Sequence, residues 1–235
     1  MPPTETALVV GVGPGVGESV ARRFDAEGVG VGLLARSADF LDDLATDLDD
    51  ATALHLDATD ADAPDRALSR VRESHGPVDA LVLNLPGPAD AGGDATAVDP
   101  SNLRRAWAQQ VPIALRFIRA AEPDLRDGGT VVVTNSMQSK RPNGVSPARA
   151  SARFALRGLV GSLADGLSDD GIHVAHLVID GWIDRPDLRE RFPDHEPWTD
   201  PDAVADTCWH LVDQSGDAWT HELDVRARGD EVRFG

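Results

Sequence analysis

Seven short apolar stretches alternate with longer helix-period stretches along nearly the whole chain, and this alternation limits the possible folds most. The expected strands cover 6–11, 29–35, 52–57, 79–84, 129–135, 172–179 and 222–226. The expected helices lie near 16–27, 37–48, 61–74, 100–121, 147–168 and 201–213. Near-continuous apolar runs indicate strands that are buried on both faces, as in a parallel sheet. The pattern therefore predicts an α/β fold with about seven parallel strands flanked by helices.

The chain has 235 residues, of which 41% are hydrophobic. Because single α/β domains routinely reach this length, we expect one domain covering residues 1–235. Alternating strands and helices favour a doubly wound, Rossmann-type sheet, whose right-handed crossovers place ligands at the carboxyl ends of the strands. Functional side chains are therefore expected at that edge.

The charge is strongly acidic, with 40 Asp and Glu against 22 Lys and Arg and a net charge of −18. This charge opposes binding to nucleic acids or acidic membranes. Strongly hydrated carboxylates indicate the cytoplasm of a salt-accumulating halophile. The single cysteine, Cys208, excludes an intrachain disulfide and a thiolate metal cluster. There is no basic leader and no apolar run of about 18–20 residues, so we expect a soluble protein without a membrane anchor.

The first expected strand leads directly into a glycine-rich segment, Gly11-Val-Gly-Pro-Gly-Val-Gly17. Glycines there let the backbone approach a pyrophosphate at the positive end of the following helix. The spacing fits GxxxGxG through Gly11, Gly15 and Gly17, and it does not fit GxGxxG. We expect these glycines and Val16 to hold a dinucleotide, although a glycine-rich turn without a ligand is the simpler alternative.

Further motifs follow in a matching order. Asp57-Ala58 ends the third strand, Asn84-Leu-Pro-Gly87 ends the fourth, and Asp180-Gly-Trp-Ile183-Asp-Arg185 follows the sixth. Together with GxxxGxG, these segments resemble the short-chain dehydrogenase/reductase family over residues 5–226. The resemblance implies a nicotinamide dinucleotide cofactor, with Asp57, Ala58 and Asn84 near the adenosine and the backbone of Ile183 at the nicotinamide. Alone, Asp57 or Asn84 could be an ordinary strand-end cap.

The end of the second strand reads Ala35-Arg36-Ser37. NAD-selective members of the family carry an acidic residue there, whereas a guanidinium and a hydroxyl suit the 2′-phosphate of NADP. We therefore expect NADP(H) in preference to NAD(H). The alternative is that Arg36 pairs with Asp39.

The resemblance also locates the positions of the family's catalytic residues. Arg149 stands at the Tyr position, Arg153 at the Lys position, Ser136 at the Ser position and Gln110 at the Asn position of the proton relay. The sequence contains no tyrosine at all, so no shift of register restores a Tyr. Arginine cannot replace it as proton donor near neutral pH, but Arg153 could still hold the nicotinamide ribose.

Arginines gather at this same end of the predicted sheet. Arg149, Arg153 and Arg157 repeat at i, i+4 and i+8, and Arg141 and Arg185 lie in nearby loops. Such a group suits an anionic ligand, unless the arginines pair with nearby carboxylates such as Asp165, Asp184 and Asp187.

The seven histidines show no compact metal-ligand spacing, and we predict no metal site. His176 is a less favoured candidate for the missing proton donor, since a satisfied histidine within the sheet is the simpler interpretation.

Three functions remain open. The first is an NAD(P)-dependent oxidoreductase on a small carbonyl or alcohol substrate. The second is a catalytically silent dinucleotide-binding sensor or partner subunit, and the third is a lyase or isomerase on the same fold. Family resemblance also implies a homodimer or homotetramer through helices 100–121 and 147–168. Residues 186–200 correspond to the variable substrate lid and do not identify the substrate.

Overall fold

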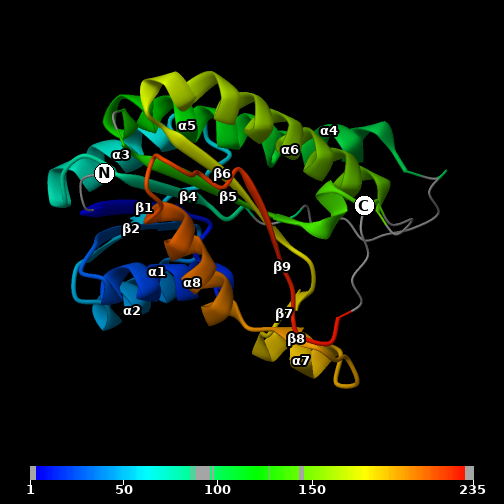
Figure 1. Ribbon diagram of the computed structural model, residues 1–235. Helices are drawn as coiled ribbons and strands as arrows, with labels where there is room; N and C mark the ends of the chain where they lie inside the picture. The colour runs from blue at the N-terminus through cyan, green and yellow to red at the C-terminus, as the bar shows by residue number, and fades with distance from the viewer. Residues whose placement is uncertain are drawn as a thin grey trace.

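The structure is a computed structural model, and it describes residues 4–85, 87, 96, 98–126, 128–142 and 146–230. Figure 1 shows a central sheet with helices on both sides. Of the sequence motifs, Pro86 within the Asn84–Gly87 segment lies outside the described residues, as do the two ends of the predicted domain.

The seven predicted strands form one sheet in which every pair is parallel, in the order β3-β2-β1-β4-β5-β6-β9. This arrangement confirms the predicted fold class. The order reverses between β1 and β4, and a doubly wound sheet opens a ligand crevice at that point. The strands are β1 (Thr6–Val10), β2 (Gly30–Ala35), β3 (Ala51–His55), β4 (Ala80–Leu83), β5 (Thr130–Ser136), β6 (His173–Ile179) and β9 (Glu222–Val225).

Successive side chains of each central strand enter two separate cores. Leu8, Leu81 and Val131 belong to the first core and Val9 and Val82 to the second, as the two-residue period of a strand requires. The first core lies under α3 (Ala63–Ser74), α5 (Val111–Leu125) and α6 (Pro147–Leu167), and the second under α1 (Val16–Ala26), α2 (Ala38–Asp47) and α8 (Pro201–Val212). Burial on both faces explains the near-continuous apolar runs in the sequence.

The prediction of one continuous helix over 100–121 is wrong, because the segment forms two helices. The first is α4 (Pro100–Ala108) and the second is α5, with Gln110 between them at φ −132° and ψ −67°. Pro112 lies in the first turn of α5. A proline inside a continuous helix would clash with the carbonyl four residues earlier, whereas the first turn accepts it.

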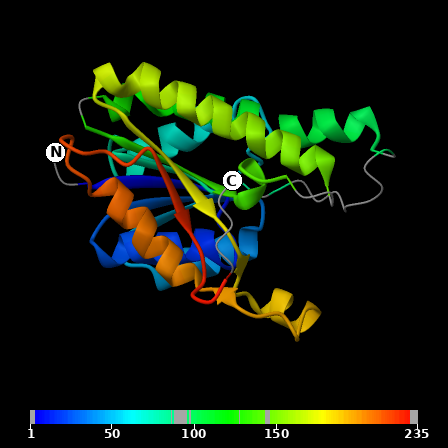
Figure 2. The same cartoon turned by 45° about the vertical axis from the view of Figure 1, so that its right-hand side comes forward.

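Three small elements follow the carboxyl end of β6. The strands β7 (Trp182–Ile183) and β8 (Trp198–Thr199) form a small parallel pair, and α7 (Pro186–Arg191) lies between them in the sequence. Figure 2 shows this unit projecting from the main body below the sheet. It overlaps residues 186–200, the segment that the sequence interpretation assigned to a substrate lid. No helix in the described part of the chain is long and apolar enough to cross a membrane.

Candidate functional site

A cavity of about 710 Å³ lies along the carboxyl ends of β1, β2, β4 and β5. Many of the residues singled out from the sequence line it, and these are Gly11, Val16, Arg36, Ser37, Asp57, Ala58, Asn84, Ser136, Arg153 and Ile183. Gly15, Gly17, Gln110 and Arg149 are not among its lining residues. The fold thus brings most of the predicted cofactor and catalytic positions into one cavity.

The glycine loop distinguishes the glycines that the fold needs from one that it does not. Gly11 has φ +91°, and a Cβ there would overlap the carbonyl oxygen of Asn84. Gly15 has φ +101°, and a Cβ on Gly17 would lie 2.6 Å from the carbonyl oxygen of Gly11. A Cβ on Gly13 would meet no protein atom within 4 Å. The steric requirements therefore follow the GxxxGxG spacing.

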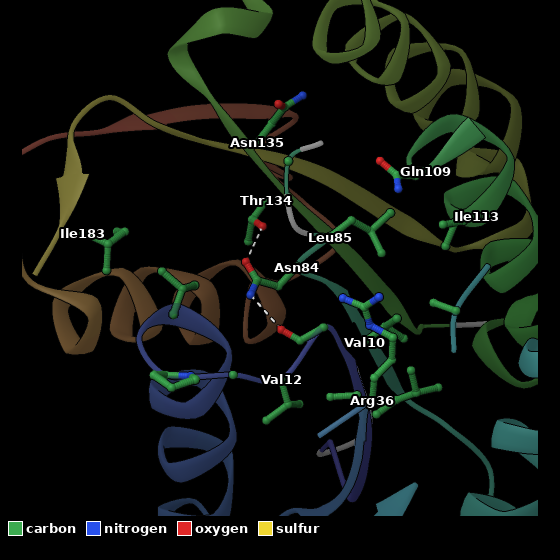
Figure 3. Close-up of a pocket in the computed structure, with 18 of the residues that line it drawn as sticks. Val10, Val12, Arg36, Asn84, Leu85, Gln109, Ile113, Thr134, Asn135 and Ile183 are labelled. Carbon is green, nitrogen blue, oxygen red and sulfur yellow. Dashed lines mark hydrogen bonds between the residues drawn. The ribbon is translucent and has the colours of Figure 1, made fainter. Parts of the chain in front are cut away.

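Asn84 connects the glycine loop to the middle of the sheet. Its Nδ2 donates to the carbonyl of Gly11 at 3.0 Å, and its Oδ1 accepts from Oγ1 of Thr134 at 2.8 Å. Figure 3 shows both hydrogen bonds, with Arg36 and Gln109 reaching the same cavity from different elements. The side chain of Asn84 thus fixes the backbone of the loop.

The β2–β3 end of the cavity carries Arg36, Ser37 and Asp57. Arg36 and Ser37 are exposed, and the described residues offer Arg36 no hydrogen bond or ion pair, with Asp39 or any other residue. Ser37 is the N-cap of α2, yet its hydroxyl accepts no backbone hydrogen bond. Asp57 accepts from the backbone N–H of Thr59 at 2.9 Å and from its hydroxyl at 2.8 Å, which lowers the pKa of the carboxyl. A guanidinium and a hydroxyl are therefore available together at this end.

Ser136, Asn135 and Arg153 form a compact group where β5 meets α6. Oδ1 of Asn135 accepts from the backbone N–H of Ser136 at 2.8 Å and from Nη1 of Arg153 at 3.2 Å. Nδ2 of Asn135 donates to the carbonyl of Arg153 at 3.2 Å. The hydroxyl of Ser136 is buried and has no hydrogen-bond partner among the described residues. Burial, together with the nearby charge of Arg149, lowers the pKa of Arg153 to about 10, so its guanidinium stays charged near neutral pH.

Arg149 lies one turn before Arg153 on α6, whose N-terminus is capped by the hydroxyl of Ser146. A Cβ on Gly87 would lie 2.8 Å from Nη2 of Arg153 and 3.8 Å from Nε of Arg149, so both guanidinium groups approach the same glycine. Gln110, at the helix break, is fully buried, whereas its neighbour Gln109 lines the cavity. The glutamine that reaches the cavity is thus displaced by one residue from the predicted position.

Three arginines of the predicted cluster pair with carboxylates of the chain, although one of them, Arg185, lines the cavity. Arg157 donates to both carboxylate oxygens of Glu222, at 2.7 and 2.9 Å. Arg185 donates to Asp187 at 3.0 and 2.6 Å. Arg141 donates to Asp180 at 3.0 Å. These three arginines are therefore neutralised within the chain, and Arg153 differs from them.

His176, the strand histidine considered as a proton donor, contacts Glu222 and lies away from the cavity. His176 does not line the cavity, and its Nδ1 contacts Oε2 of Glu222 at 2.9 Å. Burial lowers the pKa of His176. Within the described ranges, no group of three or more His, Cys, Asp or Glu side chains is placed to hold a metal ion.

The sequence interpretation missed Asn135 and Thr134, the two residues that position the predicted ones. Both are buried polar side chains at the end of an apolar strand. That position was a detectable signal, because buried polar groups are usually retained for hydrogen bonding.

A model of the short chain dehydrogenase family matches residues 5–195. The human hydroxysteroid 11-beta-dehydrogenase 1-like protein is 30% identical over 192 residues, which cover 78% of this chain and 60% of that protein. This chain covers between 53% and 60% of the length of three such relatives.

Solved structures share the fold over nearly the whole chain. A short-chain dehydrogenase from Rhodopseudomonas palustris has a TM-score of 0.81 and 27% identity, with 96% of this chain and all of that chain covered. The L-sorbose reductase of Gluconobacter frateurii, solved with NADPH and L-sorbose, has a TM-score of 0.84 and 22% identity, with 95% of each chain covered. Since the family model spans most of the sequence, the chain belongs to the short-chain dehydrogenase/reductase family of oxidoreductases.

Proposed function

We propose that the protein binds NADP(H) and is an oxidoreductase for a small carbonyl or alcohol substrate, with an atypical catalytic site. The glycine loop would hold the pyrophosphate, and Arg36 with Ser37 the 2′-phosphate. Asp57 would lie at the adenosine, Ile183 at the nicotinamide and Arg153 at its ribose. Ser136 would contact an oxygen of the substrate.

The cavity itself supports this assignment of the cofactor. Gly13 lines it, and a Cβ there would meet only open space, so a phosphate could approach the backbone closely. One observation carries the proposal. Within the described residues, the guanidinium of Arg36 has no hydrogen bond or ion pair, and the neighbouring hydroxyl of Ser37 makes no capping hydrogen bond to α2. A guanidinium and a hydroxyl match the oxygens of a phosphate monoester, and neither would favour the bare ribose of NAD.

Bound NADPH would supply a hydride to the carbonyl carbon. The chain's own contribution is to stabilise the negative charge that develops on the carbonyl oxygen through the positive charge of Arg153, while Ser136 holds another oxygen of the substrate. With no tyrosine in the sequence, the oxygen would take its proton from water. Stabilisation without a built-in proton donor predicts slow turnover compared with a complete acid–base site.

Titration of tryptophan fluorescence with NADPH and NADH tests the cofactor proposal. We expect NADPH to bind more tightly, and Arg36→Ala to weaken NADPH about 10- to 100-fold while leaving NADH unchanged, because a charge-assisted contact is lost. Arg70→Ala removes the same charge from an exposed residue of α3 and serves as the control. Equal affinity of the native chain for both dinucleotides would contradict the NADP preference, and no binding of either would contradict the function.

A dinucleotide-binding protein without turnover is the second candidate, and the absence of tyrosine favours it. The double change Arg149→Tyr with Arg153→Lys restores the residue types of the active family members. If the site is still arranged for hydride transfer, this variant should reduce carbonyl substrates faster than the native chain. Persistent cofactor binding without any reduction by either protein would support the silent protein.

We also propose a homodimer or homotetramer through α4 and α6. Leu103, Trp107 and Phe154 are large apolar side chains of these helices that remain 38–48% exposed. A second copy that covers them would remove this apolar surface from water. Sedimentation should give a dimer or tetramer that Trp107→Asp shifts toward monomer, and a monomeric native chain would contradict the proposal.

A further inference from the structure

Arg153 carries a buried positive charge without a counter-ion. The residue is 8% exposed, and within the described residues its one side-chain hydrogen bond goes to the neutral amide of Asn135. Nε is buried and has no acceptor, and no carboxylate in the described part of the chain pairs with this guanidinium. Arg153 nevertheless lines the cavity. In a chain with 40 acidic residues, a lone buried cation requires an explanation.

Arg157 provides the matched comparison on the same helix. Four residues further along α6, it donates two hydrogen bonds to the carboxylate of Glu222. Removing a charge from water is unfavourable unless a partner compensates it. The described chain supplies such a partner to Arg157 and none to Arg153. The missing partner is therefore expected to come from a ligand in the cavity.

The ribose of the proposed cofactor would not fulfil this requirement. Its hydroxyls are neutral, so they could accept a hydrogen bond from Arg153 and still leave its charge unpaired. Ser136 adds a second unmet donor, because its buried hydroxyl has no partner and it lines the same cavity. One N–H donor of a guanidinium and one O–H donor suit the two oxygens of a carboxylate.

We propose that Arg153 and Ser136 bind a carboxylate of the substrate, so that the chain acts on small oxo acids or hydroxy acids. This inference rests on the proposed oxidoreductase function and names its substrate class. A phosphate would offer more oxygens and a greater charge than these two donors match. Phosphate that binds as tightly as the oxo acids would therefore count against the inference.

Asn135 is the positioning residue of this subsite. Its side chain accepts from the guanidinium of Arg153 and donates to the backbone carbonyl of the same residue. It also accepts from the backbone N–H of Ser136. A single amide therefore holds the guanidinium of Arg153 and the backbone of Ser136 in fixed relative positions, which lowers the entropy lost when a ligand binds.

Calorimetric titration of the full chain at constant ionic strength, with and without NADPH, tests the inference. The probes are pyruvate and phenylglyoxylate, their neutral counterparts acetone and acetophenone, and inorganic phosphate. We expect both oxo acids to bind at least tenfold more tightly than the ketones and than phosphate. Arg153→Gln should weaken the oxo acids at least tenfold, and Arg153→Lys less. Ser136→Ala should weaken oxo acid binding about threefold. The effect is small because no protein group depends on the hydroxyl of Ser136 for a hydrogen bond.

Arg157→Gln is the control for charge on the same helix, and we expect it to leave oxo acid affinity unchanged. Retention of native affinity in Arg153→Gln would overturn the inference, as would ketones or phosphate binding as tightly as oxo acids, or no oxo acid binding at all. If Arg153→Gln does not fold, an unchanged affinity in Ser136→Ala overturns the shared carboxylate site. Failure of NADPH binding alone would contradict the proposed function, because the titration without NADPH reports the carboxylate site independently.

Discussion

The two ends of the cavity are built in different ways. At the glycine loop, polar groups of the protein are hydrogen-bonded to one another. Asn84 donates to the carbonyl of Gly11 and accepts from the hydroxyl of Thr134. Where β5 meets α6, Ser136 and Arg153 keep donors without acceptors in the described structure. The first end is fixed by internal packing, and the second retains unmet hydrogen-bonding capacity.

The comparison indicates that the glycine loop serves the stability of the fold, whereas Ser136 and Arg153 are available to a ligand. A glycine loop that packs against the end of β4 is required for the fold whether or not a dinucleotide binds. Unmet donors, in contrast, destabilise the folded chain and are retained at sites that act on ligands. The comparison predicts that changes at the loop reduce stability, while changes at the β5–α6 corner alter ligand binding and leave stability intact or improved.

The largest effect is expected from Gly11→Ala. A Cβ at φ +91° would overlap the carbonyl oxygen of Asn84, so the substitution combines backbone strain with overpacking. We expect the free energy of unfolding to fall by about 4 kcal/mol in urea titrations. Gly13→Ala is the control in the same loop, and its stability should stay within about 0.5 kcal/mol of the native value, although its NADPH affinity should decrease. Equal losses in both variants would break the comparison.

Glu222→Gln should give the next largest effect. Although burial opposes its ionisation, hydrogen bonds from Arg157, His176 and Lys140 lower the pKa of Glu222 to about 2. Loss of its charge leaves Arg157 without a carboxylate, and we expect about 3 kcal/mol of destabilisation at pH 7.

The pH dependence follows from the lowered pKa of Glu222. Its folded-state pKa lies below the ordinary value of 4.5, so its stabilisation is complete above that value and is lost as the pH falls toward 2. Urea titrations of the native chain and Glu222→Gln between pH 7 and pH 2 should therefore show a difference that shrinks with acid. A difference that stays constant over this range would contradict the assignment.

The smallest and most distinctive effect is expected from Arg153→Gln. Removal of an uncompensated buried charge should raise the free energy of unfolding by about 1 kcal/mol, while Arg157→Gln should lower it by about 2 kcal/mol. Both variants change one arginine of α6 by the same chemistry, so thermal and urea unfolding compare them directly. If Arg153→Gln and Arg157→Gln lower the free energy of unfolding equally, the charge of Arg153 is compensated by a group of the chain itself.

Local patterns in the sequence predicted the sheet and the glycine loop, because apolar periodicity and glycine spacing act over a few residues. The helix break at Gln110 was missed even though Pro112 stood in the sequence. The partner of Arg157 was also missed, because Glu222 lies 65 residues away and no local pattern indicates that pairing. Asn135 could have been noticed as a polar residue in an apolar strand, but its contacts with Arg153 arise only when α6 packs against β5.

The ionic contacts of Glu222 and Asp224 also bear on how the molecule is assembled during synthesis. Their partners Lys140, Arg157 and His176 precede them by 46 to 84 residues. A nascent chain that has produced β1 to β6 already contains the glycine loop and its Asn84 clamp. Its Arg157 and Lys140 still lack these counter-ions until β9 leaves the ribosome. The contacts of Lys140 and Arg157 with β9 therefore form later in synthesis than the glycine loop and its Asn84 clamp.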